Sequence, residues 1–139
     1  MNWRDIMDYL IRNYDLTPEV AAGILGNVSV ESGFDPEAEN CNSGAFGLFQ
    51  WLGLRKKVLE HFAEVHRLSV TDWKYQIDFA MHELDTDQSW GWPELLEATT
   101  AEEAAQIFCQ RFERPGNDVS LERRMEQAKE MYDQWMAKS

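Results

Sequence analysis

Apolar residues recur with the period of an α-helix along most of the chain, and no segment sustains the period of two that a half-buried strand requires. The clearest stripe lies in residues 18–32, where Val20, Ile24 and Val28 share one face with Glu31. Five further helices are predicted at residues 3–14, 54–67, 72–84, 100–114 and 121–136. The pattern predicts a mainly α fold, with at most a small β-hairpin near residues 40–49.

Capping residues mark the ends of these helices. Thr17 suits an N-cap, Pro18 suits the first helical position, and Gly33 suits the left-handed residue that follows a helix. Thr100 and Glu103 form a capping box at the start of the fifth helix. Glu31 is therefore expected in the last turn of the second helix.

Length and composition fit a single domain over residues 1–139. With 44% hydrophobic residues, the chain can bury one core and is too short for two. No apolar run reaches the roughly 18 residues that span a bilayer, and the N-terminus lacks the apolar stretch of a signal peptide. We expect a monomer without membrane insertion, excised from a longer protein or delivered by a larger assembly.

The formal net charge is −12. Because nucleic-acid binding needs a basic face, this charge argues against a nucleic-acid partner. The two cysteines, Cys41 and Cys109, lie far apart and lack C-x-x-C spacing, so neither a zinc site nor a disulfide framework is indicated. We predict no metal and no cofactor.

Glu31 is the main candidate for chemistry, because it continues the apolar stripe of its helix. Partial burial disfavours the charged form of a carboxyl group, and the negative end of the helix dipole does the same. A carboxyl that keeps its proton near neutral pH can serve as a general acid. The alternative is an ordinary glutamate with its tip in water.

A loop rich in glycine and aromatic residues follows this helix. Gly44 and Gly47 allow the backbone to approach a ligand closely. Amide and hydroxyl side chains there can bind sugar hydroxyl or acetamido groups, and aromatic faces suit pyranose rings, although core packing would explain the aromatic residues equally well. The predicted substrate-binding residues of the loop are Asn42, Ser43, Phe46, Gln50 and Trp51.

Residues 31–36, Glu-Ser-Gly-Phe-Asp-Pro, then residues 43–51, Ser-Gly-Ala-Phe-Gly-Leu-Phe-Gln-Trp, and then Arg55 resemble the phage tail lysozyme family. This family belongs to the lysozyme-like superfamily, together with goose-type lysozymes and soluble lytic transglycosylases. The similarity covers nearly the whole chain. Further matching positions are residues 76–79, Glu83, Leu84, residues 104–108, residues 112–116, Arg123, Ala128 and Tyr132.

The resemblance implies a lysozyme-like fold and cleavage of the β-1,4 bond between N-acetylmuramic acid and N-acetylglucosamine in peptidoglycan. It matches Glu31 to the catalytic acid, and Gln50 and Trp51 to the motif beside the cleft. It also implies action in the bacterial cell wall, with peptidoglycan glycan strands and a phage tail or secretion assembly as partners. Because peptidoglycan is largely anionic, the acidic chain gains no long-range attraction to it.

Four residues outside the loop have two interpretations each. Tyr75 and Trp92 are predicted to contact sugar, although aromatic residues also pack in cores. Arg55 either holds a muramyl carboxylate or forms a structural salt bridge, and we favour the salt bridge. Glu113 is expected to anchor the end of its helix, and the family motif leaves a role in the cleft open.

The mechanism depends on whether a second carboxylate faces Glu31. Carboxyl groups about 6.5–9.5 Å apart leave room for an attacking water, and about 5–5.5 Å suits a covalent intermediate. Asp35, Glu37 and Glu39 lie nearby in sequence. Asp35 fits better as the cap of a short turn, and the two glutamates as a solvated cluster.

Alignment with goose-type lysozymes leaves Cys41 about where those enzymes carry a water-positioning aspartate. Without such a base, the substrate's acetamido group and 6-hydroxyl could complete the reaction, as in lytic transglycosylases that give 1,6-anhydro products. We rank hydrolysis first. The alternative of another class is a catalytically inert wall-binding or structural module.

Overall fold

The computed structural model describes residues 2–115 and 120–137, and helices dominate this part of the chain. The mainly α fold class predicted from the sequence is confirmed. The helices are α1 (Trp3–Tyr14), α2 (Pro18–Ser32), α3 (Gly53–Val65), α4 (Trp73–Thr86), the 3₁₀ turn η1 (Gln88–Trp90), α5 (Trp92–Leu96), α6 (Ala101–Phe108), the π turn η2 (Cys109–Glu113) and α7 (Leu121–Ala137).

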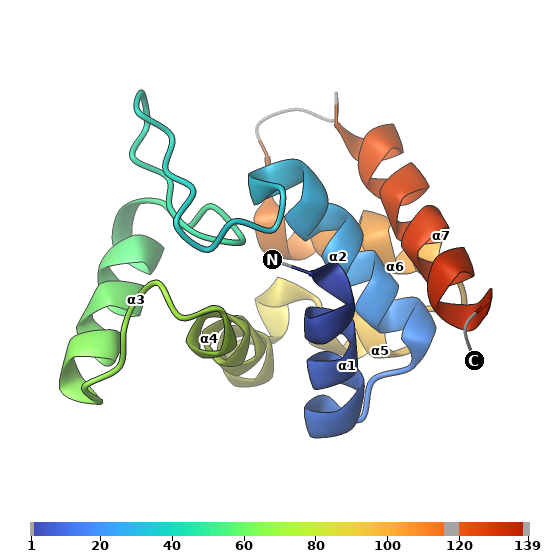
Figure 1. Cartoon of the computed structure of the whole chain (residues 1–139), viewed down its shortest axis with the longest axis horizontal. Helices are drawn as coiled ribbons and strands as arrows, with labels where there is room; N and C mark the ends of the chain where they lie inside the picture. The colour runs from blue at the N-terminus through green and yellow to red at the C-terminus, as the bar shows by residue number, and fades with distance from the viewer. Residues whose placement is uncertain (1, 116–119, 138–139) are drawn as a thin grey trace.

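Helix α2 forms the centre of the molecule, with α6 and α7 on one side and α3, α4 and the loop of residues 33–52 on the other (Figure 1). Every residue from Val20 to Val28 is buried. Two glycines on α2 allow this dense packing. A Cβ atom at Gly23 would lie 2.4 Å from Cβ of Ala104 in α6, far closer than real Cβ contacts.

Local sequence sets the ends of α2 as predicted. The Thr17 hydroxyl accepts a hydrogen bond from the backbone N–H of Val20, and Gly33 adopts a left-handed backbone with φ of 61°. Thr100 caps α6 in the same way by accepting from the N–H of Glu103. The second helix therefore carries Glu31 in its last turn.

The loop of residues 33–52 contains isolated bridges rather than the small hairpin that the sequence allowed. Phe46 and Trp51 exchange backbone hydrogen bonds of 2.9 and 2.8 Å. The buried side chain of Gln76 in α4 fastens this loop, because its Oε1 accepts from the N–H of Leu48 and its Nε2 donates to the carbonyl of Pro36. The loop is thereby held against α4.

The described residues contain no helix that is both long and apolar enough to cross a membrane.

Candidate active site

Glu31 forms an ion pair with Arg124 of α7, with 2.9 Å between Oε2 and Nη1. Arg124 is only 3% exposed, whereas 19% of the Glu31 side chain reaches solvent. The guanidinium also donates to Oδ1 of Asn27 and to the hydroxyl of Ser120, each at 2.9 Å. A buried cation fixed by three partners therefore orients the carboxylate of Glu31.

A second carboxyl group meets Glu31, and it belongs to Glu113. The two carboxyl groups lie within hydrogen-bonding reach of each other. Burial raises the pKa of Glu113 well above its usual range, and the hydrogen bond and negative charge of Glu31 raise it further. Arg124 and Arg55 lower this pKa by less. Glu113 therefore keeps its proton to higher pH than an ordinary glutamate does.

The backbone of η2 brings Glu113 to this position. We predicted one continuous helix over residues 100–114, but α6 ends at Phe108 and a π turn follows. The N–H of Arg114 donates to the carbonyl of Cys109 at 2.8 Å, which closes a wider turn than an α-helix has. Phe108 and Phe112 stack at 4.5 Å in the core. The π turn thus keeps both rings inside while Glu113 reaches Glu31.

Glu31 and Glu113 line a cleft of about 440 Å³. This cleft is the space between these two residues, the loop at Asn40 and Gln50, and Arg55 of α3. Among the described residues, no other carboxylate lines it, and Asp35, Glu37 and Glu39 lie outside its lining.

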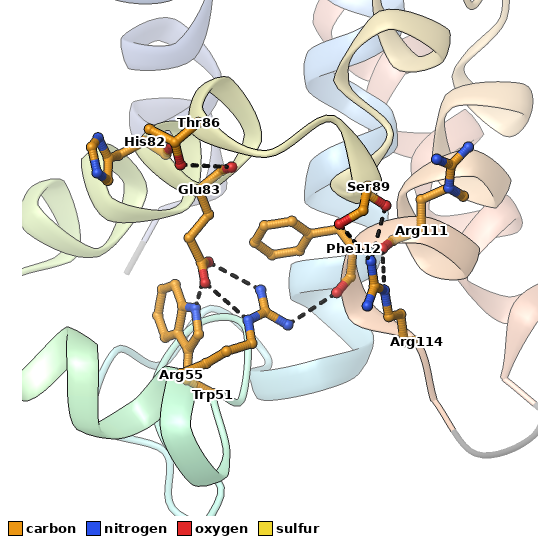
Figure 2. A network of polar contacts seen from close by, with 9 residues as sticks. All are labelled: Trp51, Arg55, His82, Glu83, Thr86, Ser89, Arg111, Phe112 and Arg114. Atoms are coloured by element: carbon orange, nitrogen blue, oxygen red, sulfur yellow. Dashed lines mark hydrogen bonds and ion pairs between the residues drawn. The ribbon is translucent and has the colours of Figure 1, made fainter.

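Arg55, which lines the cleft, connects three elements of the fold beside it (Figure 2). Its Nε and Nη2 donate to the carboxylate of Glu83 in α4 at 2.9 and 3.0 Å, and its Nη1 donates to the carbonyl of Phe112 at 3.1 Å. Trp51 donates its indole N–H to the same carboxylate at 2.9 Å. The salt bridge that we favoured for Arg55 is confirmed, and it joins α3, α4 and η2 beside Glu113.

Trp90 extends this network beside Arg55. The guanidinium carbons of Arg55 and Arg114 each lie 4.2 Å from the centre of the Trp90 ring. Arg114 also donates to the backbone carbonyl of Ser89 at 2.9 Å (Figure 2). Cationic side chains and an aromatic ring therefore stiffen the segment that follows Glu113.

Comparison with known proteins gives the family. A family model described as phage tail lysozyme matches residues 1–135. The chain belongs to the phage tail lysozyme family. Membership supports a lysozyme-like, peptidoglycan-lytic enzyme in general and leaves its exact reaction open. The chain is also 29% identical over 135 residues to Morphogenesis protein 1 of Bacillus phage B103, and the match covers 88% of this chain and 36% of that protein.

In this member of the phage tail lysozyme family, the polar loop residues divide into two groups. Gln50 lines the cleft, and its Nε2 donates to the carbonyls of Ala38 and Gly47. Asn42 and Ser43 lie in an exposed turn and are not in the cleft lining. Their backbone N–H groups both donate to Oδ1 of Asn40, which does line the cleft and which the sequence interpretation overlooked.

None of the four aromatic residues predicted to contact sugar lines the cleft. Trp51 is only 1% exposed and is a core residue, so its rings offer no face to a sugar. Phe46 is partly buried against the core. Tyr75 is buried, donates its hydroxyl to the carbonyl of Leu59, and lines a pocket that is separate from the cleft. Trp92 lines a further separate pocket.

Two residues at the site carried a signal in the sequence that the interpretation did not use. Arg124 shares a helical face with Ala128 and Met131, which marks it as an inward-facing cation. Asn27 falls within the apolar run of α2 and is completely buried. A charged or amide residue on an apolar face needs polar partners, and here these two residues bind each other.

Cys41, aligned with the water-positioning aspartate of goose-type lysozymes, is exposed in the loop and does not line the cleft.

Proposed function

We propose that this domain cleaves the β-1,4 bond between N-acetylmuramic acid and N-acetylglucosamine in peptidoglycan, with Glu31 as the general acid. The observation that carries the proposal is the contact of Glu31 with Glu113 and Arg124 at the wall of the cleft. Glu113, whose pKa burial raises well above the usual range of glutamate, holds a proton beside Glu31 to higher pH, and such a carboxyl pair is suited to protonate a leaving oxygen. Membership in the phage tail lysozyme family supports the same reaction class.

The residues around the pair fit a polymeric sugar substrate. Asn40 and Gln50 offer amide groups on the loop side of the cleft, and Leu52, which is half exposed, offers apolar surface at its edge. A mixed lining of this kind can bind hydroxyl and acetamido groups while it packs against C–H faces. In the reaction, the proton of Glu31 passes to the glycosidic oxygen as the bond from this oxygen to C1 breaks.

Hydrolysis is the first candidate for the second half of the reaction, because the family is one of lysozymes. Transglycosylation is the second candidate, and a specific observation favours it. Among the described residues that line the cleft, the only carboxylates are Glu31 and Glu113. No separate carboxylate there is available to activate water. The substrate's own 6-hydroxyl would then attack C1, and Glu31, now a carboxylate, would accept its proton.

We further propose that the domain works in the bacterial cell wall as part of a phage tail or a related assembly. The chain spans about a third of the length of the phage morphogenesis protein that it matches, so further domains are expected to accompany it in such assemblies. The net charge of −12 supports delivery by an assembly, since the anionic wall does not attract an acidic domain over distance.

Zymography on purified cell walls tests the enzymatic proposal. We expect Glu31→Gln to lower clearing by about 10²-fold or more, the usual contribution of a general acid. Glu37→Gln is the matched control, because this glutamate is exposed and lies outside the cleft lining. Equal clearing by wild type and Glu31→Gln would overturn the assignment. Wall binding without clearing by either protein would identify an inert module instead.

Mass spectrometry of the released fragments separates the two reactions. Reducing muramic acid ends are expected from hydrolysis. A predominance of 1,6-anhydro ends would replace our first candidate with transglycosylation.

A further inference from the structure

We propose that Glu113 stores the proton that Glu31 delivers to the glycosidic oxygen, and that Arg124 sets which of the two carboxyl groups holds this proton before substrate binds. The inference rests on the proposed function and adds a second participating residue to it. Glu113 supplies a proton to Glu31 and acts on the substrate only through Glu31. It is therefore a positioning residue.

The geometry of the pair carries this inference. Glu113 comes from η2 and Glu31 from α2, and both carboxyl groups line the cleft within hydrogen-bonding reach of each other. A hydrogen bond between two carboxyl groups requires at least one proton, because two carboxylates would only repel each other. With one proton, the pair carries a single negative charge, and either carboxyl group can hold the proton.

The surrounding charges decide where the proton rests. Arg124 of α7 forms its ion pair with Glu31, which favours the negative charge on that residue. Arg55 of α3 also faces the pair, but its guanidinium is occupied by the carboxylate of Glu83. Arg114, next to Glu113 in sequence, lines the cleft as well. No histidine lines it among the described residues, so Glu31 and Glu113 are the acidic groups there that can hold a proton.

The reaction step then follows with all protons accounted for. As the glycosidic oxygen approaches Glu31, the proton of Glu113 moves to Glu31, and the proton on Glu31 moves to this oxygen while its bond to C1 breaks. Both carboxyl groups are now ionised, beside Arg124 and the positive charge that develops on the sugar. Attack on C1 by water, or by the 6-hydroxyl of the substrate, returns one proton to the pair and restores the resting state.

The pH dependence of kcat tests this role on the whole domain. Glu113→Gln keeps a hydrogen-bond donor toward Glu31 but cannot release a proton. We expect kcat at neutral pH to fall by about tenfold to a hundredfold, with little change in KM. We also expect the alkaline limb of the profile to move to lower pH, because the variant lacks the carboxyl group whose pKa is raised. Glu113→Asp, which still titrates, should restore part of the activity at neutral pH.

A purely structural role for Glu113 gives a different result. The profile would keep its shape, and Glu113→Gln would lower the rate by the same factor at every pH. That outcome overturns the inference. The proposed function fails separately, if Glu31→Gln remains as active as wild type.

Carbon-13 NMR of glutamate carboxyl groups covers the case in which Glu113→Gln does not fold. In wild type, one carboxyl should titrate well above the usual range of glutamate. In Glu31→Gln, this resonance should titrate at lower pH, because the negative charge of its partner is gone. A wild-type spectrum without such a resonance, or one that Glu31→Gln leaves unmoved, would also overturn the inference.

Discussion

A Cβ atom placed on Gly26 would lie 2.4 Å from the backbone carbonyl oxygen of Arg124. This glycine of α2 therefore permits the close approach of α7 that brings the guanidinium of Arg124 to Glu31. The ion pair at the candidate active site depends on helix packing one turn away from it. Gly26 has no side chain, yet the position of Arg124 at the site depends on it.

Gly26→Ala tests this dependence. The added methyl group would also lie 2.8 Å from Cβ of Ala128, so α7 must shift outward, and we expect a loss of stability of about 1–3 kcal/mol. We also expect activity per folded molecule to fall, because the contact between Arg124 and Glu31 loosens. Denaturant unfolding and zymography measure the two effects. Ile6→Val in the buried face of α1 is a control for stability alone, and equal specific activities of both variants would contradict the prediction.

The fold and the site were predictable from the sequence to different extents. The bounds of α2 followed from Thr17 and Gly33, because caps act within a few residues of a helix end. The pairing of Glu31 with Glu113 did not follow. It depends on the π turn and on the packing of α2 against α6 and α7, which no local pattern reports.

The aromatic residues illustrate the same limit. Trp51 follows a glycine-rich loop, which fits a sugar platform as well as a core residue. Its burial and its bond to Glu83 are set by the position of α4. Composition alone could not separate these outcomes, because tryptophan suits both environments.

The raised pKa of Glu113 predicts a pH dependence of stability. Between the ordinary glutamate pKa of 4.5 and the higher pKa of Glu113 in the folded protein, the folded state keeps a proton that the unfolded state has released. Wild-type stability should therefore fall as pH rises through this window, by at most about 1.4 kcal/mol per pH unit for one group. Below the window, both states are protonated and the penalty is absent.

Glu113→Gln removes this dependence. Its unfolding free energy relative to wild type should therefore increase as pH rises above 4.5. Urea denaturation across the range measures it, with Glu122→Gln at an exposed position of α7 as the control. A difference between Glu113→Gln and wild type that stays constant with pH would argue against a raised pKa.

Gln76→Leu should loosen the loop that forms one side of the cleft. The change removes the partners of the Leu48 N–H and of the carbonyls of Pro36 and Val70. Each buried polar group left unpaired costs about 1–3 kcal/mol. We expect lower stability and a higher KM on soluble glycan fragments, because Gln50 shifts with the loop. Gln110→Leu, at an exposed position, is the control and should change neither stability nor KM. An unchanged KM in Gln76→Leu would show that Gln76 does not hold the loop in the position that substrate binding requires.

Arg55 allows a test between its two sequence-based interpretations. Its forked contact with Glu83 is partly buried, with side-chain exposures of 26% and 10%. A double-mutant cycle of Arg55→Met and Glu83→Gln should therefore give a coupling energy of about 1–3 kcal/mol, within the range for residues in contact. Glu83→Gln retains an acceptor for the indole of Trp51, so the cycle isolates the ion pair from that bond.

The same variants separate a structural role of Arg55 from binding of a muramyl carboxylate. If Arg55 acts through the cleft wall, Arg55→Met and Glu83→Gln should raise KM by similar factors, since each breaks the same contact. If Arg55 binds substrate directly, Glu83→Gln frees the guanidinium for the ligand, and only Arg55→Met should raise KM. We expect similar factors, because Arg55 already donates to Glu83 from two nitrogens and to the carbonyl of Phe112 from the third.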